Sequence, residues 1–583
     1  MQSVTVHLHK AFTGLIIGLI NLAEASKRDS RIRWCILAGV SLASLLLIGY
    51  HTGSFDQSIH LPFLKAWADP TLYPTDPFIR LRYEQYSFFW FLFLPFARCG
   101  LLEPAMFVCH LCAVLLTFWA TWRLAYILFN DSLTALIGVI VLAFPHLDLL
   151  GFPFIEFSLL NRTFALPFVL LAIDLYLRQK QLSAFALLGL LYNLHVLSVN
   201  YALIVLVGVE LAEARVSFPK LVSQSARLAA QAFIFILTAL PVLLWRFNSH
   251  LPIDLTLRTD WVQTALNGML RHLLFPFSTE PYALATNLSG LCAVFLFFVA
   301  QWSAPSPRYK RALLGMVIAC LVTLGFQALM ARWLPVTFLM QLQLARVSGL
   351  LFLLCILSIV HNTAQALRDG RLKGSLALLT IGALILSTLS FMLLPVWALL
   401  RRKIHISFTT AWSGILVYLI IVILGAGWTG WWNPRIQIYP PASPWLDVQI
   451  WARLNTPKDA LFITPPEKWD LYLPDWRTYS ERATLAGYND LLEVALIPSY
   501  LDTWLNRISF LIPGKLEWPT NNFLINRQYL AKAFTQLSDA DLTSGACAYQ
   551  VNFLVAHINQ PHSFPVVYEN SEFRVYELSC PVK

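Results

Sequence analysis

The chain has 583 residues, of which 57% are hydrophobic and only 13% are charged. Soluble domains carry roughly 25% charged residues, and this chain contains repeated apolar runs of about 14–22 residues, so its composition indicates a polytopic α-helical membrane protein. A β-barrel is excluded because it would show short alternating segments. Much of the net charge of +10 falls in loops on one predicted side of the membrane, so it is not a signal of nucleic-acid binding.

Residues 1–33 are expected to form a cytoplasmic segment without a cleaved signal. The stretch 12–23 is short and amphipathic, which predicts a helix lying at the membrane interface. The first apolar run, 34–50, directly follows four basic residues, which by the positive-inside rule place the N-terminus in the cytoplasm. These basic residues are Lys27, Arg28, Arg31 and Arg33.

A large first external loop, 51–104, is predicted after this span. Its first part, "YHTGSFDQSIHLPFLKAWADPTLYPTDPFIR" (50–80), has three aspartates, several aromatic residues and four prolines. This mixture is too polar for lipid and suits a lid over a site at the membrane surface. The apolar run 86–97 is broken by Pro95 and is expected to stay at the surface, since as a crossing it would place "RQKQ" (178–181) outside.

The remaining apolar runs predict twelve further spans, for a total of thirteen. Two long runs, 183–212 and 373–400, are hard to divide, and splitting both brings the basic segments 215–220, 306–311, 368–373 and 401–403 to the cytoplasmic side. The predicted spans are 105–126, 132–146, 163–178, 183–196, 197–212, 227–246, 286–302, 312–329, 347–361, 373–386, 388–400 and 407–428. Residues 34–430 are thus the transmembrane domain.

Residues 431–583 are predicted to be a soluble extracytoplasmic domain of the α/β or α+β class. "ALFITPP" (460–466) is typical of a buried strand, and "VNFLVAH" and "FRVYELS" are typical of two paired strands. The domain has two cysteines, Cys547 and Cys580, which can form one disulfide outside the cytoplasm.

The topology gathers several ionisable groups on the external side. Charges at membrane depth are costly and are rarely kept without a partner or a role. Arg162 and Arg346 each open an apolar run, so snorkelling to the interface is an alternative to a functional role. His195 could instead cap a helix, and Asp69, Arg82 and Glu84 are expected to be solvated loop charges. The candidate site residues are Asp56, Asp148, Glu156, Arg162, His195 and Arg346.

Such a set suggests one kind of chemistry. A carboxylate near the membrane surface can act as a general base on a hydroxyl group. Arginines can hold a phosphate through bidentate hydrogen bonds. A lipid-linked phosphate donor would need both groups.

Three stretches resemble the GT-C superfamily of membrane glycosyltransferases, which includes oligosaccharyltransferases and protein O-mannosyltransferases. They are "GSFDQSIHLPFLKAW", with an acidic residue soon after the first span, "EPAMFVCHLCAVLLTFWATWRLAYILF" (103–129), and "NRTFALPFVLLAIDLYLRQKQLSAFALLGLLYNLH" (161–195). More narrowly, "HLPFLKAWADPTLYPTDPF", "LNTPKDALFITPP" and "RTYSERATLAGYND" look like an uncharacterised bacterial branch, seen often in cyanobacteria.

The resemblance implies a membrane glycosyltransferase. It makes Asp56 the general base, or a metal ligand if a metal is present. The donor would be a polyprenyl-phosphate sugar that enters from the lipid, with Arg162 and Arg346 as candidates for its phosphate. The chain departs from the family pattern in that "FDQ" has one carboxylate where many relatives have two, and the second acidic position is left open between Asp148 and Glu156.

The cofactor is therefore left unknown, with a divalent cation possible but not strongly implied. The expected partners are membrane lipids, the sugar-bearing lipid and a glycan, lipid or protein acceptor, and no nucleic acid. The expected location is the bacterial inner membrane. A transporter or flippase is an alternative, although no internal pseudo-repeat is visible, and so is a non-catalytic envelope assembly protein.

Overall fold

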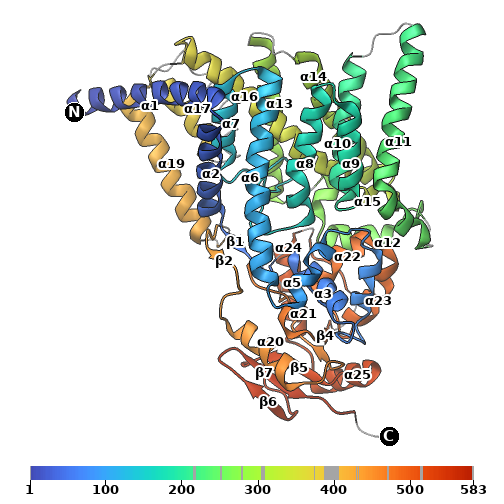
Figure 1. The fold of residues 1–583 in the computed structure, drawn as a ribbon. Helices are drawn as coiled ribbons and strands as arrows, with labels where there is room; N and C mark the ends of the chain where they lie inside the picture. Colours follow the sequence, from blue (N-terminus) through green and yellow to red (C-terminus); the bar gives the residue numbers. More distant parts are fainter. Residues whose placement is uncertain are drawn as a thin grey trace.

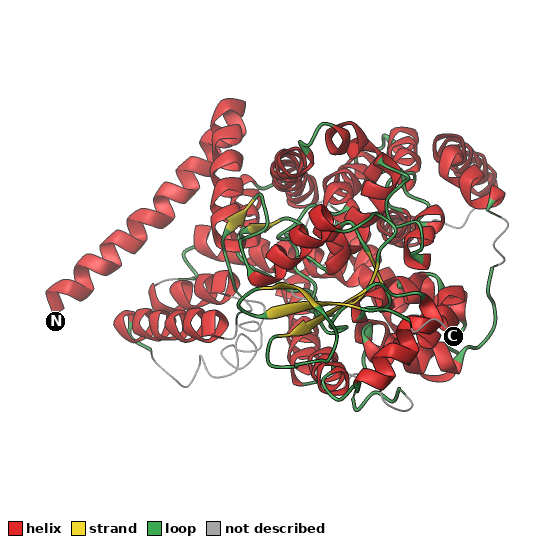
Figure 2. Cartoon of the chain, turned by 90° about the horizontal axis from the view of Figure 1, so that it is seen from below, coloured by secondary structure: helices red, strands yellow, loops and turns green. Residues whose placement is uncertain are grey.

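The computed structural model describes residues 2–580 in thirteen segments, separated by gaps. The gaps are residue 55, 214–217, 250–252, 278–279, 304–308, 373, 387–405, 429, 431, 469–471, 513–515 and 521. Long helices stand side by side in a bundle, and the C-terminal residues gather at one end of it (Figure 1). Helix α1 lies across the opposite end and projects beyond the outline of the bundle (Figures 1 and 2).

The bundle is built from apolar helices because its sequence offers hydrophobic side chains on every helix face. Its helices, with α1, are α1 (Gln2–Arg28), α2 (Ser30–Ile48), α6 (Leu102–Phe129), α7 (Ser132–Leu142), α8 (Asn161–Leu177), α9 (Gln181–Tyr192), α10 (Val196–Glu213), α11 (Phe218–Asn248), α13 (Pro281–Ser303), α14 (Lys310–Trp333), α16 (Ser348–Arg368), α17 (Gly374–Leu386) and α19 (Phe408–Trp428). Shorter elements between them are β1 (Tyr50–His51), α3 (Gln57–Ala68), α4 (Pro77–Arg80), η1 (Leu81–Glu84), η2 (Trp90–Phe93), α5 (Leu94–Arg98), α12 (Thr259–Trp261), η3 (Val262–Leu266), η4 (Arg271–Leu274), α15 (Thr337–Gln341) and η5 (Leu344–Val347).

Eight helical segments of the described chain are long and apolar enough to cross a membrane. This supports a polytopic membrane protein, while the total of thirteen spans stays a prediction. Three further apolar helices, including α7 and α9, have only 10–17 residues. The run 183–212 divides into α9 and α10 as predicted. The predicted span 388–400 and the basic segment 401–403 lie outside the described residues.

The run 86–97 does not form a crossing. It folds as the 3₁₀ turn η2 and the five-residue helix α5, which are too short to cross a membrane, so the prediction that this run does not span is confirmed.

Ion pairs join three elements at the end of the bundle that carries α1. Arg368, the last residue of α16, pairs with Asp131 at the N-cap of α7 (2.8 Å) and with Glu24 of α1 (3.4 Å). This end is therefore the one that holds the basic segment around Lys27 and Arg28 and the turn after α16.

The C-terminal region is an α/β unit. Its sheet has the strand order β4-β3-β5-β7-β6, in which β3 is parallel to β4 and β5, while β7 is antiparallel to β5 and β6. The predicted buried strand and the predicted strand pair are confirmed as β3 and as β5 with β7. The elements are β2 (Ile436–Gln437), α20 (Pro444–Asn455), β3 (Leu461–Ile463), α21 (Trp476–Ser480), β4 (Ala483–Thr484), η7 (Tyr488–Asp490), α22 (Leu491–Leu496), η8 (Pro498–Tyr500), α23 (Leu501–Ile508), α24 (Phe523–Phe534), α25 (Asp539–Tyr549), β5 (Phe553–His557), β6 (Val566–Glu569) and β7 (Phe573–Glu577).

Cys547 of α25 and Cys580, beyond β7, form a disulfide with a Cα–Cα distance of 5.3 Å. The two residues close a loop that contains the strand pair.

The loop 51–104, called the first loop below, and the C-terminal unit share one hydrophobic core. Phe63 and Phe78 of the loop belong to the same buried cluster as Ile463 and Tyr488, and Trp261 of α12 joins it as well. Strand β1, directly after α2, also pairs with β2, directly before the C-terminal unit. The loop is thus packed against the C-terminal unit as a structured layer between it and the bundle.

An arginine cluster strengthens this layer, and we call Asp76, Arg477 and Asp490 the Arg477 cluster. Nε of Arg477 donates to Asp76 (2.7 Å), and its Nη1 and Nη2 donate to the two carboxylate oxygens of Asp490 (2.7 and 3.2 Å). All three side chains are at most 1% exposed. The guanidinium also lies over the ring of Phe78, so the cluster ties the loop to the C-terminal unit with every arginine nitrogen in use.

Candidate functional site

A cavity of about 1310 Å³ lies where the bundle, the first external loop and the C-terminal unit meet. Its walls include the starts of α8 and α10, the end of α11, the turn η5, the loop 84–87 and the helix α22. Drug-sized ligand sites commonly occupy about 300–1,000 Å³, so this cavity can hold a larger molecule. Five of the six predicted site residues line it, namely Asp56, Glu156, Arg162, His195 and Arg346.

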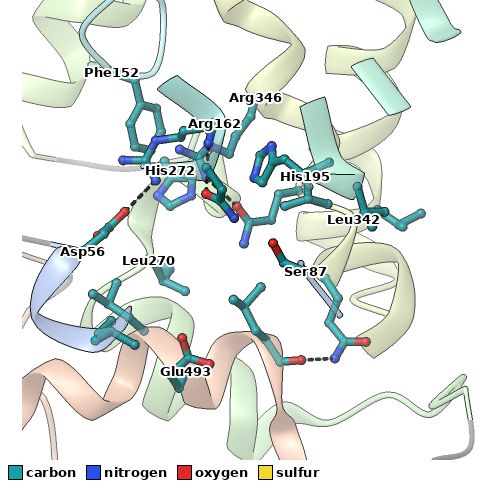
Figure 3. Close-up of a pocket in the computed structure, with 18 of the residues that line it drawn as sticks. Asp56, Ser87, Phe152, Arg162, His195, Leu270, His272, Leu342, Arg346 and Glu493 are labelled. Carbon is teal, nitrogen blue, oxygen red and sulfur yellow. Dashed lines mark hydrogen bonds and ion pairs between the residues drawn. The ribbon is translucent and has the colours of Figure 1, made fainter. Parts of the chain in front are cut away.

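Arg162 is the centre of this group. Helix α8 begins at Asn161, so Arg162 sits in its first turn with the side chain facing the cavity (Figure 3). Its Nη1 donates to Asp56 (2.6 Å) and its Nε to Glu156 (2.6 Å). Its Nη2 is buried and has no hydrogen-bond partner in the described structure. One donor of this guanidinium is therefore left for a ligand.

The local backbone frees Asp56 to reach Arg162. Asp56 occupies the N-cap position of α3, but its backbone is already helical and its side chain caps nothing. The next residue, Gln57, ties the start of α3 to its surroundings: its Oε1 accepts from the N–H of Gly53 and its Nε2 donates to the carbonyl of Leu159. The ion pair of Asp56 with Arg162 spans 106 residues of sequence.

Arg346 lies beside Arg162 on the same wall (Figure 3). Its Nη1 donates to the side chain of Gln343 (3.2 Å), and its guanidinium lies 4.3 Å from the ring centroid of Phe152. No carboxylate of the described residues forms an ion pair with it. A partly buried cation without a counter-ion, next to an arginine with an unused donor, makes this wall suited to an anion.

One ring nitrogen of His195 is bonded to the first turn of helix α10. Its Nδ1 accepts from the backbone N–H of Ser198 and lies 2.6 Å from that residue's hydroxyl oxygen, at the start of α10. An accepting Nδ1 places the proton of the neutral ring on Nε2. His195 is therefore a helix cap as well as part of the cavity lining.

Asp148 lies outside the large cavity, on an adjoining hollow of about 130 Å³. Its Oδ2 accepts from the hydroxyl of Ser348 (2.5 Å), and its Oδ1 accepts from the backbone N–H groups of Leu150 and Phe152. These bonds hold the loop before α8 against the start of α16. Between the two acids that the sequence left open, Glu156 is thus the one that stands with Asp56 at Arg162.

Several lining residues carried no signal in the sequence. Arg246 lies at the end of α11, Arg258 precedes α12 and His272 lies on η4, and all three line the cavity. Glu493 comes from α22 of the C-terminal unit, is 1% exposed, and accepts a hydrogen bond from Nε2 of Gln85 (2.6 Å). Burial raises the pKa of Glu493 from 4.5 to about 8, so the group is mostly protonated at neutral pH.

Other charged groups of the first loop are structural or solvated. Asp69 is 41% exposed and pairs with Lys458 (2.7 Å), while Asp76 belongs to the Arg477 cluster. Glu84 lines the cavity, contrary to the expected solvated loop charge.

The described residues contain no group of three or more His, Cys, Asp or Glu side chains placed to hold a metal ion. Asp56 and Glu156 both direct a carboxylate oxygen at Arg162.

A family model for a domain of unknown function, DUF6798, matches residues 443–510. The match runs from α20 to the end of α23, and it includes Arg477, Asp490 and Glu493. A comparison with curated proteins gives no match. The matched residues therefore include one wall of the cavity and residues that contact the first loop. The family description assigns no activity to them.

Proposed function

We propose that this protein is a membrane glycosyltransferase of the GT-C type that moves a sugar from a polyprenyl-phosphate donor to an extracytoplasmic acceptor. The observation that carries the proposal is the meeting of Asp56, Arg162 and Arg346 around one large cavity. A carboxylate and unspent guanidinium donors are the two groups that such a transfer requires.

The arginine wall would hold the donor phosphate. Nη2 of Arg162 and the guanidinium of Arg346 are the donors available to phosphate oxygens. When the bond between the anomeric carbon and the phosphate oxygen breaks, its electron pair stays on the phosphate, which gains negative charge. Fixed cations at this position stabilise that charge without reorganising.

Asp56 would act as the base. The hydroxyl oxygen of the acceptor attacks the anomeric carbon, and its proton passes to the carboxylate of Asp56. The products are the glycosylated acceptor and polyprenyl phosphate. The hydrogen bond with Arg162 fixes the direction of the Asp56 side chain toward the cavity (Figure 3).

Exposed apolar side chains at the edge of the cavity suit a lipid substrate. Phe247, Ile253 and Leu255 line it and are 82%, 58% and 68% exposed. An isoprenoid tail could lie along such a surface while the phosphate and sugar occupy the interior.

The proposed setting is the bacterial inner membrane, with the N-terminus in the cytoplasm and the C-terminal unit outside. The basic residues near α1 and after α16 lie at the end of the bundle opposite the C-terminal unit, which accords with the positive-inside rule (Figure 1).

The deciding experiment measures release of polyprenyl phosphate and sugar transfer from radiolabelled polyprenyl-phosphate hexoses in membranes that contain the protein. Asp56→Asn should reduce transfer by about 10²–10⁴-fold, the range for loss of a general base. Asp69→Asn is the matched control, since Asp69 lies in the same loop but pairs with Lys458 at the surface. Full transfer by the Asp56 variant would remove the proposed base, and movement of the lipid across the bilayer without transfer would favour the flippase alternative.

A further inference from the structure

The cavity contains a second kind of carboxyl group, on the wall that faces the two arginines. Figure 3 places Glu493 across the cavity from Arg162 and Arg346. Asp56 and Glu156 each pair with a cation, whereas Glu493 forms no ion pair within the described chain. Its only hydrogen bond there is the one that Oε2 accepts from Gln85.

Burial, and after it the acidic groups around α22, keep Glu493 neutral. Glu84 and Asp56 approach from the first loop and add negative potential, and so does Asp490 on η7. The other titratable groups on the elements that pack against α22 are Tyr488 and Tyr500, and the π turn η3 carries none. The nearby cation Arg258 donates to the carbonyl of Pro498 but pairs with Asp260.

The hydrogen bond from Gln85 fixes which oxygen carries the proton. An amide N–H donates to Oε2, so that oxygen acts as the acceptor, and the acidic proton belongs on Oε1. Oε1 has no hydrogen bond to the described residues. The group therefore presents an O–H donor to the cavity.

Resting on the proposed function, we infer that Glu493 is a specificity residue that donates a hydrogen bond, as a neutral carboxylic acid, to a hydroxyl oxygen of the sugar on the donor lipid. The phosphate is held at the opposite wall by Arg162 and Arg346, so the sugar that it carries extends toward α22. A neutral donor suits a sugar hydroxyl, which carries no charge, and a buried site built to bind a hydroxyl discriminates strongly against ligands that lack it.

The test compares two kinds of lipid, with and without a sugar, and three variants of the full-length protein in nanodiscs. The probes are a short-chain polyprenyl phosphate and the same lipid carrying glucose, mannose or galactose, and the readout is the dissociation constant. Glu493→Gln keeps both hydrogen bonds, because its carbonyl accepts from Gln85 and its amide group donates to the cavity. Glu493→Met has similar length but no donor, and Glu572→Gln changes an exposed glutamate of the same unit.

Glu493→Met should weaken binding of the preferred sugar lipid by about tenfold, with no change for the bare phosphate lipid. Glu493→Gln and Glu572→Gln should bind both lipids like the unchanged protein. Raising the pH from 7 to 9 should remove the sugar preference of the unchanged protein, whereas that of Glu493→Gln should persist.

Three results would overturn the inference. One is a Met variant with undiminished sugar preference, another is a Gln variant as impaired as the Met variant, and the third is a set of sugar lipids that bind no better than the bare lipid. If Glu493→Met does not fold, the inference is still tested by the affinity of Glu493→Gln and by the pH dependence of the sugar preference. Failure of the unchanged protein to bind either lipid would instead refute the proposed function, and the role of Glu493 with it.

Discussion

Two arginines in this molecule each bridge two carboxylates, yet they do different work. Arg477 donates every nitrogen to Asp76 and Asp490 and is 1% exposed. Arg162 donates to Asp56 and Glu156 but keeps Nη2 without a partner, at the wall of a large cavity. The Arg477 cluster is a closed connection between two parts of the fold, while the Arg162 group is open toward a ligand. The difference between these two arginines is one nitrogen without a partner, on a residue that lines a cavity.

The largest expected effect is on the closed cluster. Arg477→Met leaves the carboxylates of Asp76 and Asp490 buried without a cation, which should lower the free energy of unfolding by about 3–5 kcal/mol. Thermal unfolding followed by tryptophan fluorescence measures it. The control, Arg574→Met, removes an exposed pair with Glu569 and should leave the unfolding midpoint nearly unchanged. An unchanged unfolding midpoint for Arg477→Met would show that Arg477 is not the structural arginine that this comparison requires.

Loss of the disulfide should destabilise the C-terminal unit without changing ligand binding at the cavity. Cys547→Ser opens a covalent link between residues 33 apart, and the loop-entropy model predicts a loss of about 3–4 kcal/mol. Cys112→Ser, at an exposed free cysteine of α6, is the control. Binding of polyprenyl phosphate should survive at temperatures where the variant is folded. Loss of binding there would mean that binding reports only the stability of this unit.

Arg162→Lys should reduce binding more than stability. A lysine keeps the charge but cannot donate to two carboxylates and a phosphate through one planar fork. The affinity for polyprenyl phosphate should fall about tenfold or more, with a smaller shift of the unfolding midpoint than Arg477→Lys produces. Arg332→Lys, at an exposed arginine at the end of α14, is the control for affinity. Equal shifts of the midpoint in the two lysine variants would count against an open site at Arg162.

The smallest effect concerns pH and the acid next to the closed cluster. Burial raises the pKa of Asp475 from 3.8 to about 6. Between these values the folded protein holds a proton that the unfolded chain has released, so this group's contribution to stability falls as the pH rises from about 4 to 6. Asp475→Asn removes that dependence, and its stability relative to the unchanged protein should rise by about 1 kcal/mol per pH unit across the window. A difference that stays constant from pH 4 to 6 would show that Asp475 titrates normally.

The elements that the sequence could predict are those with a local signal. Apolar runs located the long helices, Pro95 and the positive-inside rule indicated that 86–97 does not span, and the alternation in 551–578 indicated the β5–β7 pair. The sequence also predicts an interfacial helix near the site over 267–277. This stretch instead contains the 3₁₀ turn η4, with Leu273 in the core shared with the C-terminal unit, so the helix prediction is wrong, whereas the position near the site is confirmed by the lining residues Leu270 and His272. Its hydrophobic side chain Leu273 packs against the C-terminal unit, and no local sequence pattern specifies that contact.

The sequence by itself determined that this is a helical, membrane-type chain with a distinct C-terminal unit, because span length, charge bias and strand periodicity are properties of neighbouring residues. It also predicted that the charged residues Asp56, Arg162 and Arg346 lie on the same side of the membrane and belong to a site. Only the tertiary structure decided that Asp56 and Glu156 share Arg162, that Asp148 belongs to a loop, and that Glu493 faces the arginines. The contacts of Asp56 with Arg162, of Asp148 with Ser348 and of Glu493 with Gln85 each join residues more than a hundred positions apart, so the packing of the whole chain sets them.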